Sequence, residues 1–276
     1  MTARRLQQVR VPVLWNRETV PGIFHLGLAV EDAFDRARPG QFVMVRFSQG
    51  VAPLLRRPFS IHRRTDDGGR VTGIELLYKV VGEGTRAMSR LGTGDRVDVL
   101  GPLGNGFTVG AGVKRVALAG GGIGVAPLVF LAETLVAEGF DPSAIEAFLG
   151  AGTEDDLLCA DRFAAMGMSV HLTTDDGSAG LQCLVTHPLE MVLAQSPPDL
   201  ICACGPMAML ACVAGLAEKF KIDAQVSIEA LMACGLGACL GCAVAQSAKG
   251  AGFLHACLDG PVFDAQRLDL SGRFLR

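Results

Sequence analysis

Short apolar runs, separated by turn residues, occupy the first part of the chain. They lie at residues 11–14, 23–26, 42–47, 74–81 and 97–100. Short strands at such spacing are typical of an antiparallel β-barrel. We therefore expect a β-barrel domain over residues 1–108.

The pattern changes after residue 114 to apolar strand, glycine turn and long helix. Strands are predicted at 116–119, 145–149, 170–174 and 200–204, and helices at 125–138 and 207–220. Because strands that alternate with helices form parallel sheets, we expect an α/β domain over residues 109–222. The alternation stops at about residue 222, and the glycine- and cysteine-rich residues 223–276 are expected to form a separate C-terminal module.

Composition and charge exclude some classes of function. The chain has 276 residues, of which 50% are hydrophobic and 35 are glycine, and this is typical of a compact globular protein. The net charge is -3, and Trp and Tyr occur once each. Because this leaves little material for tracking phosphates or stacking bases, no nucleic acid ligand is expected.

Two uncharged runs, residues 116–132 and 200–217, are near the length of a membrane span. Glycine and proline interrupt both runs, so we predict a strand, a turn and a helix in each, and no membrane span. Near the start, Arg4, Arg5 and Arg10 have no long apolar stretch behind them, which does not resemble a signal peptide. A cytoplasmic location is therefore expected.

Eight of the nine cysteines fall into two groups, and the ninth, Cys204, belongs to another motif. A disulfide framework is not expected in a reducing cytosol, and scattered cysteines behave as small hydrophobes. We interpret four in this way: Cys159, Cys183, Cys202 and Cys212.

Four other cysteines follow the spacing C-x4-C-x2-C-x14-C: Cys234, Cys239, Cys242 and Cys257. The first three reproduce the plant-type [2Fe-2S] pattern, and the surrounding residues are mostly Gly and Ala. Small neighbours are required because the loop must fold around a cluster and direct N–H groups at the sulfurs. Structural zinc, which usually takes two close pairs of ligands, and free thiols are the alternatives.

Two turns predict a nucleotide site. One contains Gly121, Gly122, Ile123 and Gly124 after the strand at 116–119, and the other contains Cys204, Gly205, Pro206 and Met207 at the end of the strand at 200–204. A pyrophosphate can approach bare backbone there and meet the positive end of the following helix. One glycine turn also fits a purely structural role, but two at the carboxyl edge of one sheet favour a ligand. The acidic residues 152–156 favour NAD(H) over NADP(H), whose 2′-phosphate requires Arg or Lys.

Residues of the expected barrel suggest a flavin. Arg57 is a candidate partner for a pyrophosphate, to which Gly84 and Thr85 offer N–H and hydroxyl donors. Phe59 is a candidate cover for the flavin ring.

Six motifs, in this order, make the whole chain resemble the ferredoxin reductase superfamily. They are R-P-F-S at 57–60, Y-K-V-V-G-E-G-T at 78–85, G-P-L-G-N-G-F at 101–107, A-G-G-G-I-G-V-A-P at 119–127, C-G-P-M at 204–207 and the four-cysteine pattern. Within the superfamily, the chain is most similar to the electron-transfer subunits of type B dihydroorotate dehydrogenase. Two residues depart from the family pattern: Phe59 stands where many members have Tyr, and Leu231 where the family often has Arg.

The resemblance implies a fold, cofactors and their contacts. The fold is an N-terminal antiparallel FAD-binding barrel, a parallel-sheet nucleotide-binding domain and a C-terminal [2Fe-2S] module. The implied FAD contacts are Arg57, Pro58, Phe59, Ser60, Leu77, Tyr78, Lys79, Gly84 and Thr85. The implied cluster ligands are Cys234, Cys239, Cys242 and Cys257.

The resemblance also implies a role in pyrimidine (UMP) biosynthesis. An FMN-containing dihydroorotate dehydrogenase catalytic subunit is the implied partner, in a heterotetramer of two copies each, and electrons pass through the cluster and FAD to NAD⁺. A flavin is needed because nicotinamide exchanges hydride whereas a cluster exchanges single electrons. No side-chain acid or base is required, so no catalytic residue is predicted, and the histidines are interpreted as core, surface or hydrogen-bonding residues. These are His25, His62, His171, His187 and His255.

Three alternatives stay open at this point. A subunit of a ferredoxin:NAD(P) oxidoreductase or of a sulfhydrogenase shares the same three parts. A regulatory module that senses redox state binds the same groups without turnover. A zinc-stabilised structural protein explains the cysteines alone.

Overall fold

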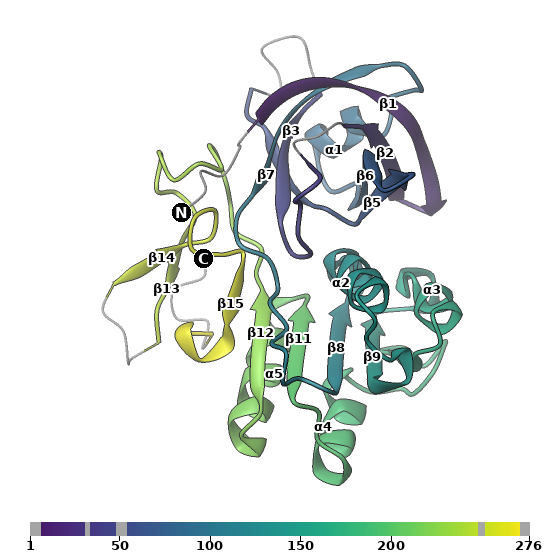
Figure 1. Cartoon of the computed structure of the whole chain (residues 1–276), viewed down its shortest axis with the longest axis vertical. Helices are drawn as coiled ribbons and strands as arrows, with labels where there is room; N and C mark the ends of the chain where they lie inside the picture. The colour runs from purple at the N-terminus through teal and green to yellow at the C-terminus, as the bar shows by residue number, and fades with distance from the viewer. Residues whose placement is uncertain (1–6, 31–33, 48–53, 248–251, 271–276) are drawn as a thin grey trace.

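The computed structural model describes residues 7–30, 34–47, 54–247 and 252–270. Arg4 and Arg5, which entered the reasoning about the start of the chain, lie outside these residues. Figure 1 shows a curled antiparallel sheet above an α/β domain, with the C-terminal segment beside both. The predicted fold class is confirmed.

Seven strands of the described residues form the first sheet, in the order β4-β3-β7-β1-β2-β6-β5. Their bounds are β1 Gln7–Val20, β2 Ile23–Ala29, β3 Phe42–Arg46, β4 Arg57–Ser60, β5 Arg63–Asp67, β6 Arg70–Lys79 and β7 Arg96–Leu103. Alternate side chains, such as Leu26 and Leu28 of β2, point into one apolar core because successive residues of a strand face opposite sides. The edge strands β4 and β5 follow one another in the chain, so the sheet curls into a half-barrel that is open between them. The short helix α1 (Glu83–Met88) follows β6 and buries Met88 in the same core.

The second sheet has the order β10-β9-β8-β11-β12-β15. Its parallel strands are β8 Val116–Gly121, β9 Ile145–Ala151, β10 Ser169–Thr174, β11 Leu200–Cys204 and β12 Asp223–Ser227. Four helices cover it, namely α2 Ala126–Ala137, α3 Ala160–Ala165, α4 Thr186–Gln195 and α5 Met207–Phe220. Residues of α2 and α3 share a core with Leu118 and Ala147, whereas residues of α4 and α5 share another with Ala117 and Phe148. Both faces of the sheet are therefore buried, which explains its continuous apolar strands.

Both uncharged runs, residues 116–132 and 200–217, fold as strand, turn and helix, as predicted. In the part of the chain that the structure describes, no helix combines the length and the hydrophobicity needed to cross a membrane.

The C-terminal segment adds a hairpin of β13 (Ala243–Ala245) and β14 (Phe253–His255), and the strand β15 (Val262–Asp264). β12 lies beyond the boundary expected at residue 222 and continues the parallel sheet, and β15 then pairs antiparallel with β12. The strand–helix alternation therefore does not stop at residue 222. β12 escaped prediction because it is short and carries polar residues. The three domain limits stay a prediction.

A polar cluster joins the half-barrel to the α/β domain. The buried Glu75 accepts hydrogen bonds from His25 (2.7 Å) and Arg63 (3.1 Å). Arg63 also donates to both carboxylate oxygens of Glu133 on α2, at 2.9 Å each, and Arg162 of α3 donates to Glu133 at 2.8 Å. Burial raises the pKa of Glu75, but the His25 hydrogen bond and the Arg63 charge outweigh it, so the pKa is lowered.

His62 is buried at the same junction. Its Nδ1 lies 2.9 Å from the carbonyl oxygen of Ala126, the first residue of α2. Since a carbonyl can only accept, Nδ1 carries the proton. Burial lowers the pKa of His62 to about 4, so the ring is neutral at pH 7.

We expect His62 to make the stability of the protein depend on pH. The unfolded chain, in which the His62 pKa is about 6.5, binds more protons between pH 6.5 and the folded value of about 4. Stability is therefore lost as the pH falls through this window, by about 2 kcal/mol between pH 7.5 and pH 5. Urea titrations at the two pH values measure the loss of unfolding free energy. The variant His62→Gln should reduce this loss, while its side-chain amide still donates a hydrogen bond to the Ala126 carbonyl oxygen.

His187→Gln is the matched control, because His187 is exposed on α4. It should keep the full pH dependence of the wild type. Equal losses of unfolding free energy in wild type and His62→Gln would contradict the assignment.

Candidate functional site

The strand order reverses between β8 and β11, the two central strands of the parallel sheet. The turns that follow them lie side by side, and helices α2 and α5 start there. In open α/β sheets a ligand binds at such a switch point, outside the carboxyl ends of the strands. The two predicted nucleotide turns therefore meet at one place in the fold.

The two turns can touch because the glycines in them have no side chains. A Cβ on Gly121 would stand 2.7 Å from both Pro206 Cδ and Met209 Sδ. A Cβ on Gly124 would overlap the backbone carbonyl of Cys204. Gly122, by contrast, has φ +52° and open space around it, so its backbone is accessible to a ligand.

A cavity of about 410 Å³ lies over the switch point. Of the eight predicted nucleotide residues, Gly121, Gly122, Ile123 and Pro206 line it. The other four do not line it: Gly124, Cys204, Gly205 and Met207. The Cys204 thiol is buried, which raises its pKa to about 12, so it is a packing residue and not a nucleophile.

Sequence reasoning missed most of the remaining lining. It comes from Gly150, Ala151, Gly152, Thr173, Asp175, Leu184, Val185, Thr186, Ala208, Met209 and Cys212, and from Ile23 and Lys79 of the half-barrel. The signal available was positional, because the carboxyl ends of parallel strands share one edge. Asp156, in the acidic stretch that favours NAD(H), also lines the cavity.

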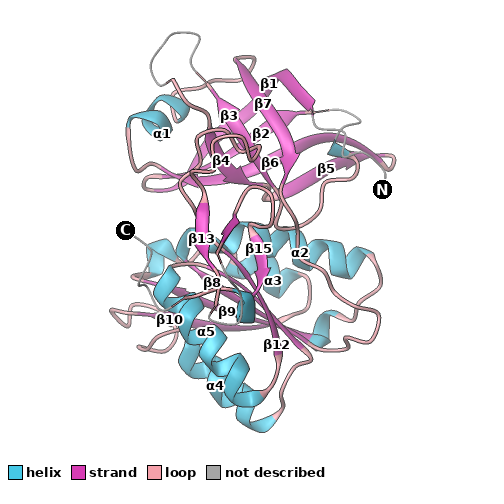
Figure 2. Ribbon diagram, turned by 90° about the vertical axis from the view of Figure 1, so that its left-hand side faces the viewer, coloured by secondary structure: helices cyan, strands magenta, loops and turns pink. Residues whose placement is uncertain are grey.

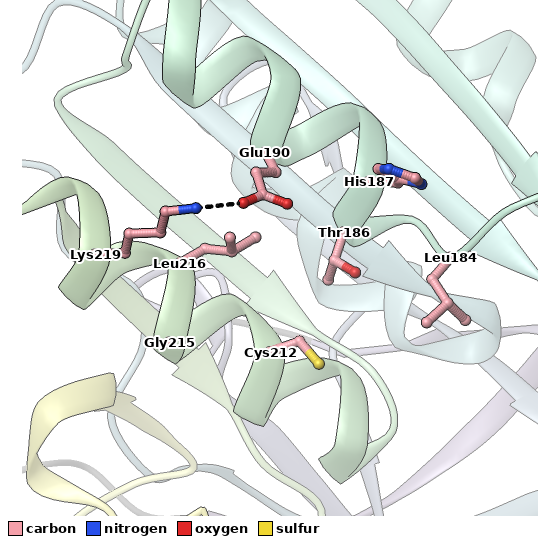
Figure 3. Close-up of a pocket in the computed structure, with 8 residues that line it drawn as sticks. All are labelled: Leu184, Thr186, His187, Glu190, Cys212, Gly215, Leu216 and Lys219. Carbon is pink, nitrogen blue, oxygen red and sulfur yellow. Dashed lines mark hydrogen bonds and ion pairs between the residues drawn. The ribbon is translucent and has the colours of Figure 1, made fainter.

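A second cavity of about 410 Å³ lies between α4 and α5. Figure 3 shows that the ion pair of Lys219 and Glu190, 2.7 Å apart, crosses this groove. Leu184, Thr186 and Cys212 line both cavities. Because the groove runs beside the helices and not over the switch point, the first cavity is the candidate nucleotide site.

Arg57 and Gly84 come together at one end of the half-barrel. A Cβ on Gly84 would stand 3.4 Å from Arg57 Nε, so the guanidinium lies against the first turn of α1. Arg57 donates to the carbonyl oxygens of Leu55 (2.8 Å) and Arg56 (3.4 Å), and no carboxylate pairs with it among the described residues. A cation beside N–H groups of a first helical turn fits a diphosphate.

Thr85 uses its hydroxyl locally. The oxygen accepts from the N–H groups of Val81 (2.9 Å) and Gly82 (3.2 Å), and the hydroxyl donates to the Gly82 carbonyl at 3.2 Å. The hydroxyl donor expected for a pyrophosphate is therefore engaged within the turn. Any contact between Thr85 and a pyrophosphate would therefore have to come from the Thr85 backbone.

Residues Leu77, Tyr78 and Lys79 lie at the end of β6, beyond the part that pairs with β5. One edge of this segment pairs with β2 and the other is open toward β4. The Tyr78 ring is buried 5.9 Å from the Phe59 ring, and its hydroxyl donates to Asn16 at 3.0 Å. Burial raises the pKa of Tyr78 to about 12. The open backbone edge, and not the Tyr78 side chain, is what a flavin can contact.

The four cysteines gather between β12 and the turn after β14. Cys234, Cys239 and Cys242 share one loop, and the β13–β14 hairpin returns Cys257 to Cys242, with 3.2 Å between the sulfurs. Gly235 and Gly237 have φ of +71° and +79°, conformations that favour glycine. Asn105, in the motif at 101–107, donates to the carbonyl oxygens of Leu258 (3.0 Å) and Asp259 (2.9 Å) and so anchors the turn after Cys257.

Backbone groups already point at the sulfurs. The N–H groups of Leu236 and Cys239 lie 3.3 and 3.4 Å from Cys234 Sγ. Burial raises the pKa of Cys234, but these hydrogen bonds outweigh it and lower the pKa to about 7. Burial, and then the neighbouring Cys242, raise the pKa of Cys257 to about 12.

Within the described residues, no three His, Cys, Asp or Glu side chains stand together in metal-binding geometry. The thiols are instead arranged with Cys242 beside Cys257, and with Cys234 receiving the Cys239 N–H. Four thiols with N–H donors and glycine neighbours fit a [2Fe-2S] group by their chemistry.

Family comparisons cover both halves of the site. The family model described as "Iron-sulfur cluster binding domain of dihydroorotate dehydrogenase B" matches residues 229–269, which contain all four cysteines of the spacing. The model described as "Oxidoreductase NAD-binding domain" matches residues 118–215, which contain both glycine turns. 

Curated relatives match nearly the whole chain. A protein of Desulforamulus reducens is 38% identical over 88% of this chain and 91% of its own length. A protein of Caldanaerobacter subterraneus subsp. tengcongensis is 34% identical over 95% of this chain and 98% of its own length. Both are named dihydroorotate dehydrogenase B (NAD(+)), electron transfer subunit.

Solved structures share the fold. A chain from the structure of an NADH-dependent reduced ferredoxin-NADP oxidoreductase has a TM-score of 0.80 and 29% identity, over 95% of this chain and 90% of that one. A ferredoxin NADP⁺ reductase of Neisseria gonorrhoeae, solved with FAD and NADP, has a TM-score of 0.63 and 16% identity, over 77% of this chain and 91% of that one. The second likeness shows the fold alone.

We expect Gly124→Ala to destabilise the protein by about 1–3 kcal/mol, because the added methyl group collides with the Cys204 backbone. Urea unfolding measures the change, and the affinity for NADH should fall as the two turns separate. Gly215→Ala is the control, since Gly215 lies exposed in α5 with open space around it. It should stabilise by about 0.5–1 kcal/mol. A Gly124→Ala protein as stable as the wild type would refute the close packing of the turns.

Proposed function

The chain belongs to the family of dihydroorotate dehydrogenase B (NAD⁺) electron-transfer subunits, and from this premise we propose its function. It transfers electrons between a dihydroorotate dehydrogenase catalytic subunit and NAD(H), through a [2Fe-2S] cluster and FAD, in pyrimidine biosynthesis. One observation carries the proposal: a four-cysteine loop that matches the family's cluster domain lies in one chain with a switch-point cleft.

The three groups have distinct places in this proposal. Arg57 and the first turn of α1 hold the FAD diphosphate, while Pro58, Phe59, Ser60 and the open edge of Leu77–Lys79 border the flavin ring. The cleft between the two glycine turns holds NAD(H), and Cys234, Cys239, Cys242 and Cys257 bind the cluster. Residues 1–108, 109–222 and 223–276 are then the FAD, NAD and cluster units, with β12 and β15 tying the third to the second.

Contacts between the units support short distances between the three proposed places. Met44 of β3 pairs with Pro58 of β4, and a Cβ on Gly235 would stand 2.6 Å from Met44 Cγ. The cysteine loop therefore packs against the strand next to the flavin strand. Ile23 of β2 and Lys79 of β6 line the nucleotide cleft, so the proposed nucleotide site also borders the half-barrel.

Bound FAD would supply the ability to exchange hydride with a nicotinamide and single electrons with a cluster. The chain positions these groups and excludes water between them. No side chain is assigned as acid or base in this proposal.

Exposed leucines surround the cysteine loop, where the catalytic subunit is proposed to dock. Leu231 is 88% exposed, and Leu236, Leu240 and Leu258 are also exposed. Cys239 is exposed on the same loop, whereas Cys242 and Cys257 are buried. Apolar side chains grouped around an exposed ligand favour a protein interface. The complex is proposed to be a cytoplasmic heterotetramer of two copies of each subunit, the catalytic one containing FMN.

A ferredoxin:NAD(P) oxidoreductase subunit is the second candidate. The solved structure that favours it is 29% identical to this chain, whereas the dihydroorotate dehydrogenase B relative from Desulforamulus reducens is 38% identical. The family model for the cysteine segment also belongs to dihydroorotate dehydrogenase B.

We expect Cys239→Ser to remove the cluster and leave FAD bound, because the two groups use different residues. Iron, acid-labile sulfide and flavin analyses of anaerobically purified protein measure this. NADH-dependent reduction of ferricyanide should persist, while electron transfer to the catalytic subunit should fall to background. Cys212→Ser, which changes an exposed cysteine of α5, should keep iron and sulfide. Zinc in place of iron and sulfide in the wild type would overturn the proposal.

We expect Leu231→Glu to weaken binding of the catalytic subunit by about tenfold or more, because a charge would enter an apolar interface. Titration calorimetry measures the Kd, and native mass spectrometry tests for two copies of each subunit. Met191→Glu is the control, since Met191 is 57% exposed on α4, away from the cysteine loop. A Leu231→Glu protein that binds as tightly as wild type would exclude this docking face.

A further inference from the structure

The nucleotide cleft holds a cation that is already neutralised. Among the described residues that line it, the charged ones are Lys79, Asp156 and Asp175. Lys79 Nζ lies 3.1 Å from Asp156 Oδ1. The single cation of the lining is therefore paired with an acid of the same lining.

This ion pair crosses the cleft between the two domains. Lys79 is the last residue of β6 in the half-barrel, and Asp156 ends the short 3-10 helix Glu154–Asp156 after β9. The Lys79 side chain is 47% exposed and that of Asp156 is 38% exposed. A pair as exposed as this is weak, so a charged ligand can separate its partners.

We propose that the Lys79–Asp156 ion pair sets the choice between NAD(H) and NADP(H). Asp156 repels a 2′-phosphate and also holds the ammonium group that would otherwise bind it. The cleft thus contains a phosphate-binding cation whose charge Asp156 offsets. This inference rests on the proposed NAD(H) site and goes beyond it, because it names Lys79 as a latent determinant of NADP(H) binding.

Electrostatics gives the direction of the effect. A 2′-phosphate carries between one and two negative charges near pH 7, and each unit charge about 4 Å away contributes on the order of a few-fold in affinity even in water. Removing the Asp156 charge both ends the repulsion and frees Lys79. Asp175 stays in the lining and keeps some repulsion, so the change is expected to be partial.

The test uses the full-length protein with its flavin and cluster. Asp156→Asn should lower the ratio of kcat/KM for NADH to that for NADPH by about tenfold, mostly through a lower KM for NADPH. Ferricyanide reduction measures both rates. The NADPH KM of the variant should also rise more steeply with salt than in wild type, because a newly exposed cation is screened.

The Lys79 partner is tested in the Asp156→Asn background. Adding Lys79→Met should remove the gain with NADPH, and adding Lys79→Arg should keep it. Binding of 2′,5′-ADP compared with 5′-AMP reports the 2′-phosphate contact without any need for electron transfer, which matters if a Lys79 variant loses flavin. Glu190→Gln breaks the Lys219–Glu190 pair, whose side chains are 60% and 40% exposed, outside this cleft, and should leave the ratio unchanged.

An unchanged ratio in Asp156→Asn, or a gain that survives Lys79→Met, overturns the inference. Failure of the proposed function looks different. In that case the wild-type protein, with flavin and cluster confirmed, oxidises neither NADH nor NADPH.

Discussion

The relation between the half-barrel and the α/β domain governs the rest of the structure, because the nucleotide cleft and the cysteine loop both take contacts from the half-barrel. Arg63 connects the two by bonding Glu75 on its own sheet and Glu133 on α2. Glu75 is 3% exposed, so it depends on its partners to compensate for lost hydration. His62 adds a neutral hydrogen bond to Ala126. Only Ile61 separates His62 from Ser60, the end of the candidate flavin strand, and Ala126 directly follows the glycine turn. The candidate flavin strand and the glycine turn are thus linked through Ile61, the His62 side chain and Ala126. Figure 2 shows α2, which begins at Ala126, directly below the half-barrel.

The cysteine loop depends on contacts of the same kind. Three of its cysteines are neighbours in sequence, but Cys257 reaches Cys242 only through the pairing of β13 with β14, in which Ala256 N–H donates to the Cys242 carbonyl at 2.9 Å. Asn105, more than a hundred residues earlier in the chain, fastens the next turn. Gly235 lets the loop approach Met44 of the half-barrel. The loop is therefore fastened to the half-barrel unit, which keeps it close to the candidate flavin strand.

The nucleotide cleft is short of positive charge. Two acids and one paired lysine line it, so a dinucleotide must rely on backbone N–H groups and on the positive ends of α2 and α5. These helices begin at the two glycine turns. Binding through backbone dipoles suits a diphosphate shared by all nicotinamide nucleotides, whereas the side chains at the edge of the cleft distinguish among them.

The sequence alone determined the fold class, most of the strands, both glycine turns and the four-cysteine spacing. These features are local: hydrophobic periodicity specifies a strand or helix within a few residues, and a glycine at a close approach or a cysteine in a loop is visible in its own neighbourhood. Only the tertiary structure decided that Tyr78 turns its hydroxyl to Asn16, that the Thr85 hydroxyl serves its own turn, and that Lys79 faces Asp156. It also decided that β12 and β15 extend the parallel sheet past residue 222. Side-chain direction and long-range pairing depend on which surfaces meet when the chain folds, and residues distant in sequence carry no local pattern that records their contact.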